Sequence, residues 1–251
     1  MTTANRVIWV DNSSKDPAAT KAFYARVFTW DMVTDPDPQY GGYTMAKMGG
    51  TDVAGFGGQM DPNMPPSVWN LYVGTPDAAA TAAAATDAGG TVIVPPFPVG
   101  TAGIMSFIQD PSGAVIGIWQ AGTMTGFIAT GDGAFDWAEL TARGIDRAVP
   151  FYDAVFGWGQ RIRDMPDGLR YTVFVVGEDP VAGGMEMPEM VPAEVPSYWM
   201  PYFQAADVSA SFATAIAAGA REIVAPHDIP GGRFAIVADP QGGLFGLIRM
   251  E

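Results

Sequence analysis

The sequence repeats itself, and this repeat constrains the fold more than any other feature. Residues 7–30 match residues 135–158, residues 69–80 match 199–210, and residues 110–120 match 239–249. The matched segments follow the same order at nearly constant spacing, which indicates a tandem duplication. We therefore expect two modules with the same strand order, at residues 1–122 and 134–251. The Gly- and Thr-rich stretch between them, residues 123–133, is predicted to be a linker.

A finer pattern lies within each module. Residues 6–12 alternate like a strand, Asp16-Pro17 opens a helical run that ends near Phe28, and three β-type runs follow. Each module thus contains two successive βαβββ units. The remaining strands are expected near 30–34, 42–48, 52–59, 67–75, 91–94, 104–109 and 114–120, and then near 134–141, 158–163, 170–177, 180–187, 198–205, 220–224, 233–238 and 243–249; helices are expected at 77–88, 144–156 and 207–218.

Composition excludes several kinds of protein. The chain has 251 residues, no cysteine, one histidine and a net charge of −14. Disulfides, thiolate metal sites and zinc held by several histidines are therefore excluded. The negative charge argues against nucleic acid and against an anionic membrane as partners. No uncharged apolar run approaches the ~20 residues that span a bilayer, and the first residues do not resemble a signal peptide. We expect a cytoplasmic globular protein.

Two motifs suggest a family. Phe-Tyr occurs inside the first helix of each module, at Tyr24 and Tyr152, and DPxGxxxG occurs near each module's end, at Asp110 and Asp239. With four βαβββ units, the chain resembles the vicinal oxygen chelate superfamily of glyoxalases, bleomycin-resistance proteins and extradiol dioxygenases, in particular its actinobacterial tandem members of glyoxalase-like or hydroxylase type. The resemblance implies an α+β fold with two cupped mixed β-sheets, helices outside, and a ligand on the concave face.

The residues at the family's metal positions do not suit a metal. The resemblance implies His or Gln on the first strand, His on the strand that opens the second unit, and Glu on the last strand. The corresponding residues here are Trp9 and Trp137, Asn70 and Met200, and Gly117 and Gly246. Indole and glycine offer no lone pair, and the Met thioether is a soft ligand. We predict no metal and no other cofactor. An alignment shift of one or two residues adds Glu139 but supplies no histidine.

Other side chains are expected to line the concave face instead. Residues i and i+2 of a strand share a face, so Asp11 and Glu139 accompany the two tryptophans, and Tyr72, Trp119, Tyr202 and Ile248 accompany the other positions. The two glycines are expected to leave open volume where the metal would lie. The predicted ligand-binding residues are Trp9, Asn70, Tyr72, Gly117, Trp119, Trp137, Met200, Tyr202, Gly246 and His227, which suit a flat apolar ligand.

Each of these residues also has a structural interpretation. The aromatic rings either line a cup or fill a closed core. Asp11 and Glu139 either serve as general bases or accept hydrogen bonds from nearby backbone N–H groups. His227, in the Pro/Gly-rich segment PHDIPGG, is expected to be a loop residue, although histidine suits proton transfer. Arg233 either contacts an anionic ligand group or forms a surface salt bridge.

Two functions of different classes follow. The first is a metal-free protein that binds an apolar aromatic small molecule, for sequestration or resistance. The alternative is a cofactor-independent tailoring enzyme (isomerase, cyclase or hydroxylase type) on a polycyclic substrate, with Glu139 or Asp11 as general acid/base and Tyr72 or Tyr202 as hydrogen-bond donor. A protein-interaction module is a third possibility. Binding is slightly favoured because the inherited ligand set is lost. We expect a monomer that reproduces a symmetric dimer in one chain, or a weak homodimer.

The loss of the metal positions generates a prediction. The purified protein should contain no stoichiometric Zn, Fe, Mn or Ni, and EDTA should leave its melting temperature unchanged. A tightly bound native-state metal would instead produce a fall of several degrees on chelation. Elemental analysis that finds about one transition metal per chain would contradict the prediction.

Overall fold

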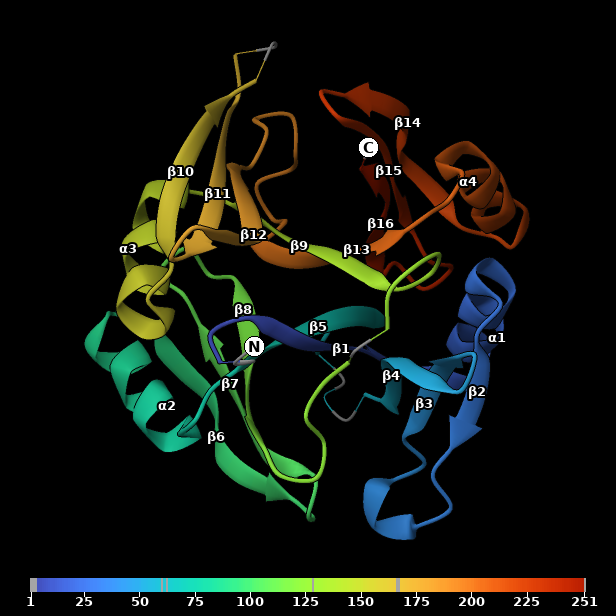
Figure 1. The fold of residues 1–251 in the computed structure, drawn as a ribbon, viewed down its shortest axis with the longest axis horizontal. Helices are drawn as coiled ribbons and strands as arrows, with labels where there is room; N and C mark the ends of the chain where they lie inside the picture. The colour runs from blue at the N-terminus through green and yellow to red at the C-terminus, as the bar shows by residue number, and fades with distance from the viewer. Residues whose placement is uncertain (1–3, 60, 62, 128, 166–167, 251) are drawn as a thin grey trace. The chain divides into compact units, whose positions relative to one another are not determined.

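The computed structural model describes residues 4–59, 61, 63–127, 129–165 and 168–250. The first module contains β1 (Val7–Ser14), α1 (Pro17–Phe28), β2 (Asp31–Thr34), the short 3₁₀ helix η1 (Pro38–Tyr40), β3 (Thr44–Met48), β4 (Thr51–Gly58), β5 (Ser67–Gly74), α2 (Ala78–Asp87), β6 (Thr91–Val99), β7 (Gly103–Gln109) and β8 (Val115–Ala121). The second contains β9 (Phe135–Ala142), α3 (Ile145–Phe156), β10 (Gly159–Asp164), β11 (Arg170–Val176), β12 (Asp179–Glu186), β13 (Tyr198–Gln204), α4 (Val208–Ala217), β14 (Arg221–Ile229), β15 (Gly232–Ala238) and β16 (Leu244–Met250) (Figure 1).

The two modules have the same topology. One eight-stranded sheet has the order β2-β3-β4-β1-β5-β8-β7-β6, and the other has the order β10-β11-β12-β9-β13-β16-β15-β14. The two orders are identical when each strand is matched to its repeat. Both sheets are mixed, since β1–β4 and β9–β12 are parallel pairs and the outer pairs are antiparallel. The predicted α+β class, the four βαβββ units and the shared strand order are confirmed.

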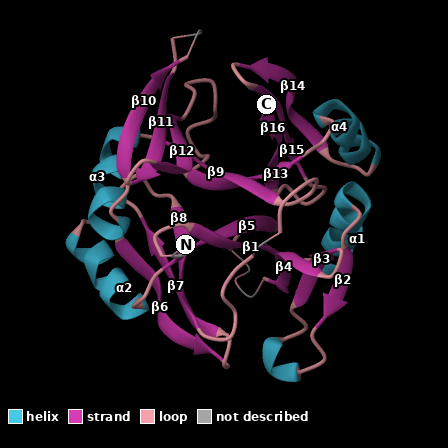
Figure 2. Ribbon diagram, in the orientation of Figure 1, coloured by secondary structure: helices cyan, strands magenta, loops and turns pink. Residues whose placement is uncertain are grey.

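The compact units of the chain cut across these modules. The α2–α3 unit consists of Met1–Trp9, Leu71–Gly126 and Trp137–Trp199, and the α1–α4 unit consists of Val10–Asn70, Phe127–Asp136 and Met200–Glu251. Each unit therefore combines the first βαβββ of one module with the second βαβββ of the other. Within its unit, α2 packs against α3 and covers β6, β7 and β8; α4 packs against α1 and covers β14, β15 and β16 (Figure 2). No helix of the described residues is long and apolar enough to cross a membrane.

Local sequence signals explain where the helices begin. The Asp16 side chain accepts a hydrogen bond from the backbone N–H of Ala19, and Asp77 and Asp207 cap α2 and α4 in the same way. Helix α3 begins differently, because Gly144 precedes it in a left-handed conformation and has no side chain to cap the helix. The Glu186 carboxylate accepts from the backbone N–H groups at this end instead.

Two of the four sheet-edge strands, β6 and β14, are longer than the sequence suggested. The predicted ends at residues 94 and 224 are wrong, because β6 continues to Val99 and β14 to Ile229. Both are terminal strands of their sheets, so each has a neighbouring strand on one side only. Prolines such as Pro95 and Pro226, which have no backbone N–H to donate, are tolerated in such edge strands. The placement of His227 in a loop is wrong for the same reason, since this residue lies within β14.

The two family motifs meet in the core of each unit. In the α1–α4 unit the Tyr24 hydroxyl donates to Asp239 Oδ2 at 3.1 Å and accepts from Trp69 Nε1 at 2.8 Å. Ser67 Oγ donates to the same carboxylate oxygen at 2.6 Å. The other Asp239 oxygen accepts from the backbone N–H of Gly243, which closes the DPxG turn. The Phe-Tyr motif of the first module is thereby joined to the DPxG motif of the second.

The α2–α3 unit repeats this arrangement. The Tyr152 hydroxyl donates to Asp110 Oδ2 at 2.8 Å and accepts from Trp199 Nε1 at 2.7 Å. Both tyrosines are fully buried, and burial, followed by the charge of the aspartate, raises the pKa of each phenol well above its usual value. These buried hydrogen bonds therefore stabilise the fold.

We predict that Tyr24→Phe and Tyr152→Phe each lower the free energy of unfolding by about 1–3 kcal/mol, because a buried carboxylate loses a hydrogen-bond donor. The two losses should be nearly additive, since the residues belong to different networks. Urea unfolding measures both. Tyr40→Phe on η1, outside either network, is the matched control. An unchanged unfolding midpoint in both buried variants would contradict this role.

Candidate functional site

Three side chains of the α2–α3 unit form a hydrogen-bonded row on the sheet. Trp137 and Glu139 project from β9, and Tyr171 projects from β11. Trp137 Nε1 donates to the Tyr171 hydroxyl at 2.9 Å, and that hydroxyl donates to Glu139 Oε2 at 2.8 Å. Glu139 is 9 % exposed, whereas the two rings are half-buried. We call these three residues the second-module site.

A glycine allows Tyr171 to reach Glu139. Strand β12 lies between β11 and β9, and its Gly183 pairs with Glu139 on one side and with Val173 on the other. A Cβ at Gly183 would overlap the Tyr171 hydroxyl and lie 2.8 Å from Trp137 Nε1. Any side chain at this position would displace the ring. On the opposite face of the sheet, Gly184 contacts Ile145 of α3, so the site lies on the face away from that helix.

The first module contains an equivalent arrangement in the α1–α4 unit. Asp11 on β1 accepts a hydrogen bond from the Tyr43 hydroxyl at 3.2 Å and from Asn70 Nδ2 at 2.8 Å. Gly55 pairs with Asp11 in the sheet, and a Cβ there would overlap the Tyr43 hydroxyl. We call Asp11, Tyr43 and Asn70 the first-module site.

Both carboxylates are thus buried acceptors with side-chain donors. The structure brings the predicted residues Asp11 and Asn70 together in one site, and Trp137 and Glu139 together in the other. Burial, followed by the negative charge of Glu139, raises the pKa of Tyr171 well above its usual value; the Trp137 hydrogen bond and the charge of Arg163 oppose this. Tyr171 therefore remains a neutral phenol that donates to Glu139 at neutral pH. Such a pair can bind a polar substituent or pass a proton along the hydrogen bond.

Tyrosine rings cover the glycines at the family's third metal position. Tyr72 pairs with Gly117 in the α2–α3 unit, and Tyr202 pairs with Gly246 in the α1–α4 unit. A Cβ at either glycine would overlap the neighbouring ring. The expectation of open volume at these glycines is wrong, because the parallel register places a ring over each of them. Neither the residue types nor the space suits the family's metal, and no group of three or more His, Cys, Asp or Glu side chains able to hold one is found among the described residues.

The remaining predicted ligand-binding residues are mostly buried. Trp9, Tyr72, Trp119, Met200 and Tyr202 are all under 9 % exposed, as is Ile248, which was expected to share their face of the sheet. Tyr72 packs against Phe107 and Trp119. This burial fits the closed-core interpretation, and a role for these residues in binding stays a prediction. Asn70 on β5 and Trp137 on β9 are half-buried. Among the predicted ligand-binding side chains on β1, β5, β9 and β13, these two are the more accessible ones.

His227 lies on the same sheet face as Tyr202. It pairs with Phe234, which pairs with Ile248, and the Phe234 ring packs edge-on against both His227 and Tyr202. The imidazole is exposed. Tyr202, Phe234 and His227 thus form a row of rings that ends at the sheet edge. The sequence around His227 did not predict this row.

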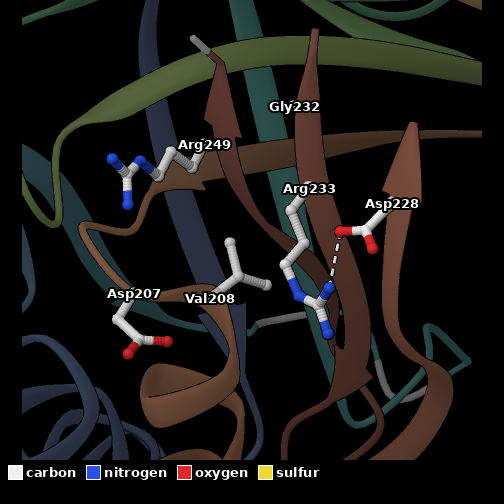
Figure 3. A pocket seen from close by; sticks show the side chains of 6 residues that line it. All are labelled: Asp207, Val208, Asp228, Gly232, Arg233 and Arg249. Carbon is white, nitrogen blue, oxygen red and sulfur yellow. Dashed lines mark hydrogen bonds and ion pairs between the residues drawn. The ribbon is translucent and has the colours of Figure 1, made fainter. Parts of the chain in front are cut away.

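Two cavities lie elsewhere in the units. One, of about 320 Å³ in the α1–α4 unit, is lined by Asp207, Val208, Asp228, Gly232, Arg233 and Arg249 (Figure 3). Arg233 forms an ion pair with Asp228 there, as the salt-bridge interpretation predicted. The other, of about 270 Å³ in the α2–α3 unit, is lined by Ala4, Ile8, Gly74, Thr75, Pro76, Trp119 and Ala121. Trp119 is the one predicted ligand-binding residue in either cavity. We place the candidate site at the carboxylate–tyrosine pairs because they combine a proton donor, an acceptor and accessible ring surface.

The sequence reasoning missed Tyr43, Tyr171, Gly55 and Gly183. A signal was present, because both tyrosines and both glycines recur at equivalent positions of the repeat. Their role depends on a ring that crosses an intervening strand, which the alternation of one strand does not reveal.

Comparison with known proteins identifies the family. Residues 7–118 match the Glyoxalase/Bleomycin resistance protein/Dioxygenase superfamily, and residues 137–248 match the Glyoxalase-like domain. The chain is 39 % identical over 247 residues to CFP32 of Mycobacterium tuberculosis, provisionally named a glyoxylase, covering 96 % of this chain and 93 % of that protein. The chain belongs to the glyoxalase, or vicinal oxygen chelate, superfamily as a tandem two-module member.

Further relatives are more varied. The anthracycline biosynthesis protein DnrV of Streptomyces peucetius is 33 % identical, covering 97 % of this chain and 92 % of its own length. Among solved structures, a Mn(II)-bound glyoxalase from Novosphingobium aromaticivorans has a TM-score of 0.65 at 15 % identity, covering 98 % of this chain and 82 % of that one. The 2,3-dioxygenase LapB from Pseudomonas sp. KL28 has a TM-score of 0.65 at 14 % identity, with 97 % and 91 % covered. These two structures support the fold alone.

The buried phenols generate a prediction on alkaline stability. Tyr24, Tyr152 and Tyr171 all have a raised pKa in the folded state, so above the ordinary tyrosine pKa of about 10 the unfolded chain binds fewer protons than the folded one. The contribution of these protonated phenols to the free energy of unfolding is fully present below that pH and is lost as the pH rises further. Each phenol should steepen the loss by about 1.4 kcal/mol per pH unit. Urea unfolding between pH 9 and 11 should show a shallower decline for Tyr171→Phe than for the parent; equal slopes would contradict the prediction.

Proposed function

We propose that the protein binds a flat, largely apolar aromatic molecule without a metal, chiefly at the second-module site. The observation that carries the proposal is the half-buried Trp137 ring, which is fixed by its hydrogen bond to Tyr171 while Tyr171 is fixed by the buried Glu139. An aromatic ligand would stack on the accessible indole face. A hydroxyl or amine on the ligand would lie near the carboxylate–phenol pair.

Preorganisation is the physical basis of this proposal. Side chains that become ordered on binding cost free energy, and a ring already held in place avoids much of that cost. Aromatic contacts contribute about 0.5–1.5 kcal/mol beyond the burial of area. Trp9, the equivalent of Trp137 in the repeat, is only 3 % exposed, so the second module offers more indole surface. The relatives named for anthracycline biosynthesis are in keeping with a polycyclic aromatic ligand.

One observation favours the enzymatic alternative. Glu139 is a buried carboxylate in direct contact with a phenol, and such a pair can act as a general acid/base toward a bound polycyclic substrate. The protein would then be a cofactor-independent tailoring enzyme of the isomerase, cyclase or hydroxylase type. Binding is preferred because the family's metal positions in this module are occupied by Trp137, Met200 and Gly246, which do not form the inherited ligand set.

Trp137→Ala should weaken the binding of planar polycyclic aromatics by about tenfold for each 1.4 kcal/mol of stacking and burial lost. Isothermal titration calorimetry with a panel of hydroxylated anthraquinones measures this, and quenching of tryptophan emission provides a second readout. The repeat supplies the matched control, since Tyr43→Phe alters the first-module site and should leave the main binding event unchanged. If the entire panel leaves the heat, the emission and the melting temperature unchanged, the rings are core and the proposal is wrong.

Glu139→Gln separates the two functions. In a binding protein this isosteric change should cost modest affinity, because the amide oxygen can still accept from Tyr171. In an enzyme that uses Glu139 as its base, binding should persist while conversion of the ligand, followed by mass spectrometry, should cease. Conversion by the parent protein that Glu139→Gln abolishes would establish the enzymatic alternative.

A further inference from the structure

We infer that the second-module site selects aromatic molecules that carry a negatively charged group, with Arg161 and Arg163 of β10 as the selecting residues. This inference rests on the proposed function and names the ligand class.

The register places both arginines on the face that bears the site. Arg163 pairs directly with Tyr171, and Arg161 pairs with Val173, which in turn pairs with Gly183. Side chains at paired positions share a face of the sheet, so a continuous row leads from Arg161 to Glu139. Burial and the charge of Glu139 raise the pKa of Tyr171, and the positive charge of Arg163 opposes that rise, in keeping with its paired position across the sheet.

The two guanidinium groups are available to a ligand. Both arginines are exposed, and they lie on β10, the terminal strand of its sheet. The three ion pairs found among the described residues involve Arg6, Lys47 and Arg233. In a chain of net charge −14, two neighbouring arginines outside any such ion pair form a local positive surface beside an aromatic platform. Arginine is well suited to bidentate recognition of a carboxylate.

The first module differs at the same positions. The repeat matches Arg161 to Val33 and Arg163 to Asp35. Val33 pairs with Met45 on β3, and the backbone N–H of Asp35 donates to the carbonyl of Tyr43. An apolar and an acidic residue therefore stand where the second module has two cations. An anionic group is favoured at the second-module site only.

Sheet geometry also limits the size of the ligand. Strands β9 and β10 are separated by β11 and β12, so their backbones lie about 14 Å apart at the usual spacing of ~4.8 Å. An aromatic system that stacks on Trp137 and extends a carboxylate toward Arg163 must cross part of this distance. A fused-ring aromatic acid meets the requirement, because the long arginine side chains cover the remainder.

The test compares two probes of the same shape, anthracene-2-carboxylate and anthracene-2-carboxamide. Isothermal titration calorimetry at low ionic strength should show the carboxylate bound about tenfold more tightly, and added salt should reduce that preference by screening. The double variant Arg161→Gln/Arg163→Gln should abolish the preference while retaining affinity for the amide. Arg221→Gln, an exposed arginine on the edge strand β14, is the matched control and should keep the parent preference. Thermal melting verifies that each variant is folded.

The outcomes distinguish this inference from the proposed function. If both probes bind equally and the double variant changes neither affinity, the inference is wrong and the proposed function stands. If the carboxylate preference persists in the double variant, the selecting residues lie elsewhere and the inference is again wrong. If neither these probes nor the anthraquinones bind, the proposed function itself fails.

Discussion

The buried contact between a tyrosine hydroxyl and an aspartate carboxylate is the interaction on which the arrangement of each compact unit depends. Tyr24 comes from a helix of the first module, and Asp239 comes from the turn before the last strand of the second. Asp239 also organises its own turn by accepting from backbone N–H groups. Because a buried carboxylate must be hydrogen-bonded, the turn of one module is tied to the helix of the other. The reciprocal pair Tyr152 and Asp110 imposes the same constraint in the α2–α3 unit.

A contact between a glycine and a tyrosine ring recurs on the sheets and shapes the candidate sites. Four times, a glycine on one strand allows a tyrosine of the adjacent strand, or in one case directly before that strand, to lie across the glycine. The pairs are Gly55 with Tyr43, Gly117 with Tyr72, Gly183 with Tyr171, and Gly246 with Tyr202. In two cases the glycine stands where metal-dependent relatives are expected to have a carboxylate. There the buried ring fills the space beside the glycine. In the other two cases the phenol reaches a buried carboxylate and fixes it in place.

The repeat in the sequence was sufficient to predict that both modules share one strand order, while the cupped α+β fold was implied by the family resemblance. It could not predict the length of β6 and β14, because proline normally ends a strand and is accommodated here only by an edge position. Asn70 and Trp137 were found at the family's metal positions, and Asp11 and Glu139 were found from alternation along the strands that carry Trp9 and Trp137. Tyr171 was missed because its ring crosses an intervening strand, and Gly117 was misinterpreted because a glycine in isolation does not reveal which neighbour fills its space.

The two modules differ in the side chains of their candidate sites, although their buried core networks are equivalent. In the first-module site, Asn70 donates to Asp11 and also to Ser13, so that the amide links two positions of β1. Its repeat equivalent is Met200, a thioether that has no hydrogen to donate. Glu139 has one more methylene than Asp11, which brings its carboxylate nearer to the phenol, at 2.8 Å compared with 3.2 Å. The first site is thereby closed by polar cross-links, whereas the second keeps an accessible indole beside its carboxylate. The duplicated fold therefore keeps equivalent buried networks in both modules, while the sheet faces above them differ in polarity and in exposed ring surface.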